Sequence, residues 1–221
     1  MKVIITGATG MVGKGVLYVC LEDPRITEVV SVSRSSCGIE HDKLNEVIHK
    51  DFMDISPLSV ELPGYDACFF CMGVSAAGMN EETYTKLTLS LTKQFASTLL
   101  HHNPTMQFCY VSGAGTDSTE KSRMMWARVK GKTENTLLNM GFANSWMFRP
   151  GFIQPMRGIR SKTSWYQFFY NILKPFYGVL QKLPKYVTDT DVMGRAMIEV
   201  CIAGYKSSVL ESVDINEIGR I

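Results

Sequence analysis

The sequence has no run of apolar residues that approaches the roughly 20 needed to cross a membrane. We also expect no leader peptide, because Met1 and Lys2 pass directly into an apolar run at residues 3–5. Its formal net charge is only +2, which is too small to favour nucleic acid or an anionic membrane surface as a partner. We therefore expect a cytoplasmic protein that binds neither nucleic acid nor membrane.

The sequence also lacks the paired motifs of a zinc site or a disulfide framework. Of its six cysteines, only Cys68 and Cys71 are close in sequence, and both lie in an apolar run. Residues three apart on a strand point to opposite faces of the sheet, so these two thiols should diverge. No second CxxC or HxxxH pattern follows. We expect reduced cysteines in the core and no bound metal.

The apolar residues fall in short runs separated by segments of helical length. Apolar residues make up 45% of the chain and charged residues 20%, as in an ordinary globular core, and residues 1–221 fit one domain. The pattern predicts strands at 3–5, 27–32, 46–50, 66–72, 106–111 and 145–148. It predicts helices at 12–20, 81–102, 117–140 and 189–203, the third capped by Asp117 with Glu120. This alternation is typical of an α/β fold with a doubly wound parallel sheet, the Rossmann arrangement.

Three glycines, Gly7, Gly10 and Gly13, separate the first strand from the first helix. A helix N-terminus offers unpaired N–H groups and a positive dipole, and glycine lets a diphosphate approach the backbone. The spacing is G-x-x-G-x-x-G, so the alternative of a glycine-rich connector without a ligand stays open on these residues alone. A Walker A loop is excluded, because Ala8 and Gly15 stand where it needs Gly and Ser or Thr.

The whole string from Thr6 to Gly13 resembles the cofactor loop of the extended and atypical short-chain dehydrogenase/reductase families. The segments Val111–Gly115 and Arg149–Phe152 resemble those of Tat-interacting-protein-like oxidoreductases and NmrA-like proteins. The resemblance extends to about residue 155 and is specific for cofactor binding rather than for a substrate. It implies a Rossmann domain that binds NAD(P).

Ligands of such sheets bind beyond the carboxyl ends of the strands, and six loops with small or polar residues follow the predicted strands. The cofactor-binding residues predicted from these loops, together with Lys130, are Gly7, Thr9, Gly10, Met11, Val12, Ser33, Arg34, Ser35, Asp51, Phe52, Met72, Gly73, Val74, Pro150 and Gly151.

Arg34 indicates which nucleotide binds. NAD binders commonly carry an acidic residue after the second strand, whereas an Arg there suits the 2′-phosphate of NADP. Here Arg34 follows that strand, and no carboxylate appears before Glu40. Arg34 could also be a solvated side chain in a polar turn. We expect NADP(H) to be preferred over NAD(H).

The family resemblance also implies catalytic residues, and one of them is replaced. It assigns Lys130 to the cofactor ribose and Ser112 to a substrate carbonyl, but Trp126 stands where the family Tyr belongs. An indole N–H donates a hydrogen bond but is no acid near neutral pH, so Trp126 cannot supply the proton. Tyr84 or Tyr110 could replace it, although packing is the more common role of such residues.

Residues 156–186 combine basic and aromatic side chains with no acidic residue. Three interpretations stay open: a lid over the cleft, a surface helix that touches a membrane, or a homodimer contact. The lid is favoured, because two prolines interrupt any long amphipathic helix.

We expect an NADPH-dependent oxidoreductase acting on a small carbonyl-type substrate. The alternative is a protein that binds NADP(H) for regulation or as a scaffold, without turnover.

Overall fold

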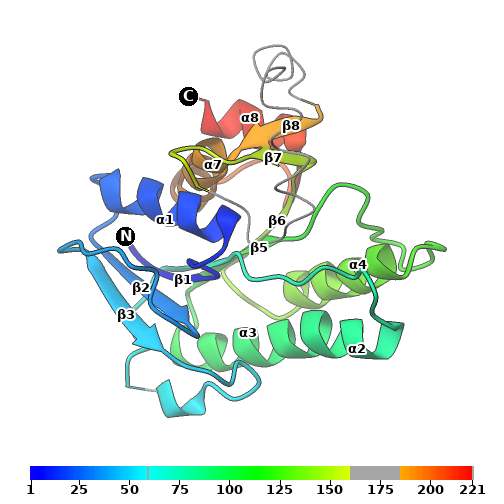
Figure 1. The fold of residues 1–221 in the computed structure, drawn as a ribbon, viewed down its shortest axis with the longest axis horizontal. Coiled ribbons are helices and arrows are strands. Elements are labelled where there is room, and N and C mark those ends of the chain that lie inside the picture. The colour runs from blue at the N-terminus through cyan, green and yellow to red at the C-terminus, as the bar shows by residue number, and fades with distance from the viewer. Residues whose placement is uncertain (59, 160–184, 221) are drawn as a thin grey trace.

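The computed structural model describes residues 1–58, 60–159 and 185–220. Its centre is a parallel sheet of seven strands in the order β3-β2-β1-β4-β5-β6-β9 (Figure 1). The strands are β1 Lys2–Thr6, β2 Glu28–Ser33, β3 Leu44–Ile48, β4 Ala67–Phe70, β5 Gln107–Val111, β6 Asn144–Arg149 and β9 Val209–Glu211. The strand order reverses between β1 and β4, so the predicted doubly wound parallel sheet is confirmed.

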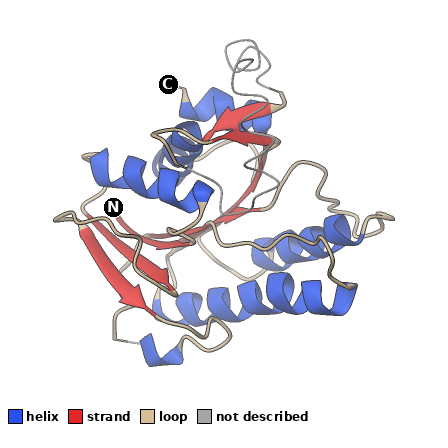
Figure 2. Ribbon diagram, viewed as in Figure 1, coloured by secondary structure: helices blue, strands red, loops and turns tan. Residues whose placement is uncertain are grey.

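Helices cover both faces of this sheet (Figure 2). On one face lie α1 Met11–Glu22, α7 Thr190–Ala203 and α8 Ser212–Gly219, and on the other α2 Glu81–Thr85, α3 Leu91–His102 and α4 Met125–Leu138. A short pair of parallel strands, β7 Phe152–Gln154 and β8 Val187–Asp189, stands apart from the main sheet. A 3₁₀ turn, η1 Ser56–Leu58, precedes β4. No described helix is long and apolar enough to span a membrane.

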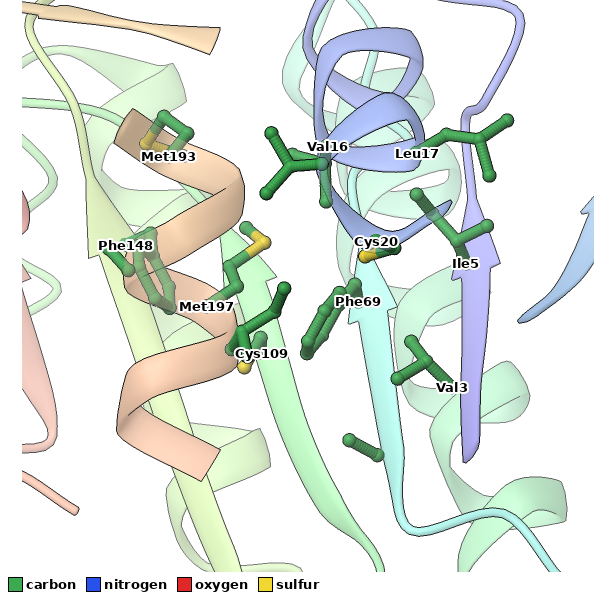
Figure 3. Packing of buried hydrophobic residues seen from close by; sticks show 14 of the residues in the cluster. Val3, Ile5, Val16, Leu17, Cys20, Phe69, Cys109, Phe148, Met193 and Met197 are labelled. Carbon is green, nitrogen blue, oxygen red and sulfur yellow. The ribbon is translucent and has the colours of Figure 1, made fainter. Parts of the chain in front are cut away.

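The two sheet faces bury separate hydrophobic clusters. Side chains alternate along β1, so Val3 and Ile5 lie in the cluster under α1 and α7, while Ile4 lies in the other. Figure 3 shows the first cluster, in which side chains of α1 and α7 meet those of the strands. Cys68 is buried in the second cluster and Cys71 packs against the first, which confirms that these two thiols diverge. All six cysteines are free.

The sequence placed the start of α4 too early. The predicted helix at 117–140 begins only at Met125. Asp117 instead closes a turn, where its carboxylate accepts the backbone N–H groups of Lys121 and Ser122 at 2.8 and 2.6 Å. Glu120, the expected partner in the capping box, has a positive φ of 61°. The prediction was wrong because a short Asp side chain satisfies the backbone of a turn as well as that of a helix.

The other predicted elements differ less from the observed ones. The third strand, predicted at 46–50, is Leu44–Ile48, and the helix predicted at 81–102 contains a π-helical turn, η2 Lys86–Ser90. The elements β9 and α8 were not predicted at all. Most of the segment interpreted as a lid, residues 160–184, lies outside the described residues.

Helices α1 and α7 pack closely because glycines stand where they cross. A Cβ added to Gly194 of α7 would lie 2.8 Å from Cβ of Val19 and 3.2 Å from Cα of Val16. A Cβ on Gly15 of α1 would lie 2.3 Å from Cβ of Thr190. The contact therefore has no space for a larger residue on either helix.

We predict that Gly194→Ala destabilises the fold by about 1–3 kcal/mol, because overpacking a close contact forces backbone shifts. The loss should occur although alanine is the better helix former. Gly73→Ala is the matched control, since a Cβ at Gly73 would meet nothing within 4 Å. Urea unfolding of the three proteins measures the difference. Equal stability of the Gly194 variant and the wild type would contradict the packing described.

Candidate functional site

A cleft of about 900 Å³ lies at the carboxyl ends of the strands. Loops that follow β1, β4, β5 and β6 line it together with one face of α4. Its volume is in the range of cofactor sites. Most of the predicted site residues are brought together here: Gly7, Thr9, Gly10, Met11, Val12, Arg34, Met72, Gly73, Val74, Ser112, Lys130, Pro150 and Gly151.

Four predicted cofactor residues do not line the cleft. The Ser33 hydroxyl is buried and donates to the backbone oxygen of Ser35 at 2.7 Å, which ties the two serines into a local turn. Asp51 is exposed and accepts a backbone N–H two residues further on. Phe52 is buried in the second core cluster, stacked on Phe95 with ring centroids 5.8 Å apart. Their part in cofactor binding stays a prediction.

Glycine is required at one position of the loop after β1 and at one position in the first turn of α1. Gly7 has a φ of 73°, and a Cβ there would lie 2.8 Å from the carbonyl oxygen of Cys71. A Cβ on Gly13 would lie 2.3 Å from the carbonyl oxygen of Gly7. The first turn of α1 therefore rests directly on the loop, and the loop on the end of β4.

The N-terminus of α1 opens into the cleft. Gly10 is the N-cap residue, and no side chain caps the helix. Met11 and Val12, the first residues of α1, line the cleft, so the N–H groups of this turn and its positive dipole are available to an anionic ligand. This arrangement fits the diphosphate of a dinucleotide.

The charge of the cleft is positive. Arg34 lines it and is exposed at the end of β2, and Lys130 lines it from α4. Among the described residues, no Asp or Glu lines this cleft. The composition of the cleft is therefore suited to an anionic ligand.

One face of α4 carries Trp126, Lys130 and Glu134, each four residues from the next. The Lys130 ammonium donates to the backbone oxygen of Ser112, and burial lowers the pKa of Lys130 from its usual 10.5 to about 8. The Trp126 indole lines the cleft and packs near Gly115, where an added Cβ would lie 3.2 Å from the ring. Trp126 therefore occupies space in the cleft beside Lys130.

Below this face lies a buried polar network. The Ser112 hydroxyl lies within hydrogen-bond distance of Glu134 Oε1 and of the Phe148 backbone oxygen, at 2.5 and 3.1 Å. Glu134 is fully buried, and Arg149 Nε donates to both of its carboxylate oxygens, at 3.0 and 3.1 Å. Arg149 also contacts Glu211 at 3.3 Å. The Ser112 hydroxyl proton therefore has two acceptors within the protein, Glu134 Oε1 and the Phe148 backbone oxygen.

Two tyrosines were considered from the sequence as proton donors. Tyr84 of α2 is 1% exposed and lines the cleft. Tyr110 is buried in the second core cluster, does not line the cleft, and has a pKa raised by burial. Tyr84 is therefore the tyrosine that this fold brings to the site.

Sequence reasoning missed Glu134 as part of the site and treated Arg149 only as part of a motif. A signal was present for Glu134, because it follows Lys130 by four residues and shares its helix face. Its pairing with Arg149 depends on the position of β6 and had no sequence signal. Within the described ranges, no three His, Cys, Asp or Glu side chains are grouped so as to hold a metal ion.

The buried pair makes a direct prediction about stability. We expect Glu134→Gln to destabilise the fold by about 3 kcal/mol or more, because it leaves Arg149 without its main counter-charge. Glu81→Gln is the matched control: its pair with Arg128, at 2.6 Å, is exposed and should contribute far less. Thermal and urea unfolding measure both variants, and similar losses would contradict a special role for the buried pair.

The sequence is similar to curated proteins from fungi and from rat. The sequence is 27% identical over 214 residues to a protein of Emericella nidulans named "Protein fmp52, mitochondrial", covering 93% of this chain and 88% of that one. It is 24% identical over 152 residues to "Protein HTATIP2" of Rattus norvegicus, covering 68% of this chain and 62% of that one. No family model matches the sequence.

The names of these relatives overturn one expectation. Proteins similar to this chain from Emericella nidulans, Aspergillus clavatus and Meyerozyma guilliermondii are all named mitochondrial. The expectation of a cytoplasmic protein is wrong on this comparison. It depended on the lack of a visible leader peptide, which does not identify a compartment.

Solved structures agree on the fold. A short-chain dehydrogenase/reductase of Saccharomyces cerevisiae superposes with a TM-score of 0.67 at 15% identity, covering 98% of each chain. One from Agrobacterium tumefaciens, with bound NAD, gives a TM-score of 0.67 at 13% identity, covering 95% of this chain and 76% of that one. The chain therefore has a Rossmann fold like that of short-chain dehydrogenase/reductases of known structure, and its sequence is similar to the fmp52 and HTATIP2 proteins.

Proposed function

We propose that this protein binds NADP(H) and is an oxidoreductase of the short-chain dehydrogenase type, acting slowly on a small carbonyl-type substrate. The observation that carries the proposal is the cleft itself. It combines a glycine loop on an uncapped helix N-terminus with Arg34, and no described carboxylate lines it.

Each part of the cleft has a role in this proposal. The N–H groups at the start of α1 hold the diphosphate, and Arg34 holds the 2′-phosphate through its planar guanidinium. Lys130 holds the nicotinamide ribose, and its depressed pKa of about 8 leaves it mostly charged at neutral pH. The backbone at Pro150 and Gly151 closes the nicotinamide end. Bound NADPH would supply a hydride to the substrate.

The proton is the difficult part of the reaction. Trp126 cannot donate one, and the Ser112 hydroxyl has Glu134 as an acceptor. Tyr84 lines the same cleft, and we propose that any turnover takes its proton from there.

Trp126 and Ser112 also favour a second candidate function, which is nucleotide binding without catalysis. A protein that binds NADP(H) for regulation or as a scaffold needs the glycine loop and Arg34 but no proton donor. Trp126 and the Ser112–Glu134 contact favour this interpretation, and the experiments below separate it from slow catalysis.

We expect NADPH to bind at least tenfold more tightly than NADH, a difference of about 1.4 kcal/mol. Arg34→Ala should abolish this preference, because it removes the one arginine among the described residues that line the cleft. Arg123→Ala, at an exposed arginine that does not line the cleft, should retain it. Titration calorimetry with both nucleotides measures the ratio. Equal affinities in the wild type would end the assignment to NADP(H).

We expect reduction of small aldehydes and ketones by the wild type to be slow, and Trp126→Tyr to raise its rate. General acid catalysis is worth about 10²–10⁴-fold, so a restored phenol beside Lys130 should give a gain within that range. Trp126→Phe is the matched control, with a similar ring and no acidic proton. NADPH oxidation followed by absorbance gives the rates.

Tyr84→Phe completes the series. If Tyr84 supplies the proton, this variant loses the residual wild-type rate while its NADPH affinity is unchanged. Tight NADPH binding with no turnover in the wild type or in Trp126→Tyr would favour the non-catalytic function instead.

A further inference from the structure

Two thiols from distant parts of the chain meet between the sheet and α7, and neither residue lines the cleft. Cys109 lies on β5, and its side chain points into the cluster under α7, close to Met197 (Figure 3). Cys201 lies in the last turn of α7. Their sulfur atoms are 3.7 Å apart, although the residues are separated by 92 positions in the sequence.

A hydrogen bond between β5 and α7 also holds the two cysteines near each other. The Gln107 side chain, two residues before Cys109 on β5, donates to the backbone oxygen of Cys201 at 2.7 Å. Gln107 is in turn fixed by Trp146, whose indole donates to its side-chain oxygen at 3.1 Å. A disulfide needs a sulfur separation of about 2.0 Å, so the two sulfur atoms must approach by less than about 2 Å. Side-chain rotation supplies a movement of this size.

The two thiols differ in access. Cys109 is fully buried, and burial raises its pKa, so it does not react first. Cys201 is only partly buried, so it is the more accessible member of the pair. Cys68 is a buried cysteine on the neighbouring strand β4, but it lies in the cluster on the opposite face of the sheet. Cys20 and Cys71 contribute to the same cluster as this pair, and Cys71 is partly buried too, so the pair is singled out by the 3.7 Å contact between its two sulfur atoms.

We propose that Cys109 and Cys201 form a reversible disulfide when the folded protein meets a low-molecular-weight disulfide. The Cys201 thiol loses its proton to water and attacks the reagent, which forms a mixed disulfide and releases one reagent thiol. The Cys109 thiol then loses its proton and attacks the Cys201 sulfur, which releases the second reagent thiol. Two protein thiols are oxidised, and one reagent disulfide is reduced to two thiols.

The bridge joins β5 to the end of α7. Because it closes a long loop of the chain, it restricts the unfolded state and raises the thermal midpoint by roughly 5 °C or more. Its formation does not depend on the nucleotide or on any catalytic activity. The inference therefore stands apart from the proposed function.

The test uses the full-length protein under native conditions with oxidised glutathione as the reagent. Remaining thiols are blocked with N-ethylmaleimide, and digested peptides are mapped by mass spectrometry. We expect the number of free thiols to fall by two from six, with Cys109 and Cys201 in one linked pair. Dithiothreitol should restore all the thiols and return the thermal midpoint to that of the reduced protein.

Variants make the assignment specific. Cys201→Ser should lose both the bridge and the rise in thermal midpoint, whereas Cys68→Ser should retain both. If Cys201→Ser does not fold, Cys109→Ala provides the same test. Unchanged thiols, a glutathione adduct that persists on Cys201, or a bridge between any other pair of cysteines would overturn the proposal.

Discussion

The close contact between the loop after β1 and the first turn of α1 is the constraint on which the site depends. At Gly13 even one added carbon would lie 2.3 Å from the Gly7 carbonyl oxygen. This contact directs the N-terminus of α1 into the cleft. The same helix continues over the sheet to α7, where Gly15 and Gly194 allow a second close approach. A single short helix thus links the glycine loop of the cleft to the core between the sheet and α7.

The cleft and the buried network beside it share residues. Lys130 and Trp126 line the cleft from α4, one helical turn apart. Ser112 lines it as well, and its hydroxyl contacts the carboxylate of Glu134, to which Arg149 donates. Taking a carboxylate and a guanidinium out of water is costly unless they are paired and hydrogen-bonded, and this network pairs the two groups. The Ser112 hydroxyl is therefore engaged by a buried ion pair.

Fold similarity alone does not specify the chemistry of this protein. Structures at 13–15% identity superpose over nearly the whole chain, because a buried parallel sheet tolerates many different apolar sequences. Activity depends instead on a few side chains at the carboxyl ends of the strands, and folds of this type host many functions. Whether this protein catalyses a reaction is therefore judged better from its cleft side chains than from the superposition of its fold. The relevant side chains are Trp126, Tyr84 and the contacting pair Ser112 and Glu134.

The sequence alone determined the strand–helix alternation, the glycine loop, and the residues that follow each strand. These are local properties: apolar runs of strand length, and glycine where the backbone must be approached closely. It also determined that Cys68 and Cys71 diverge, since side chains alternate along any strand. It misplaced the start of α4, because the Asp117 carboxylate satisfies a turn as readily as a helix cap.

Only the tertiary structure decided which distant side chains meet. The contacts of Glu134 with Ser112 and Arg149, and of Cys109 with Cys201, join elements far apart in sequence. It also separated Tyr84, which reaches the cleft, from Tyr110, which is buried in the core, and it placed Phe52 in the core as well. Such pairings depend on the order of the strands and on how each helix packs across the sheet. The local spacing of residues predicts neither the strand order nor the helix packing, because both result from burying many side chains at once.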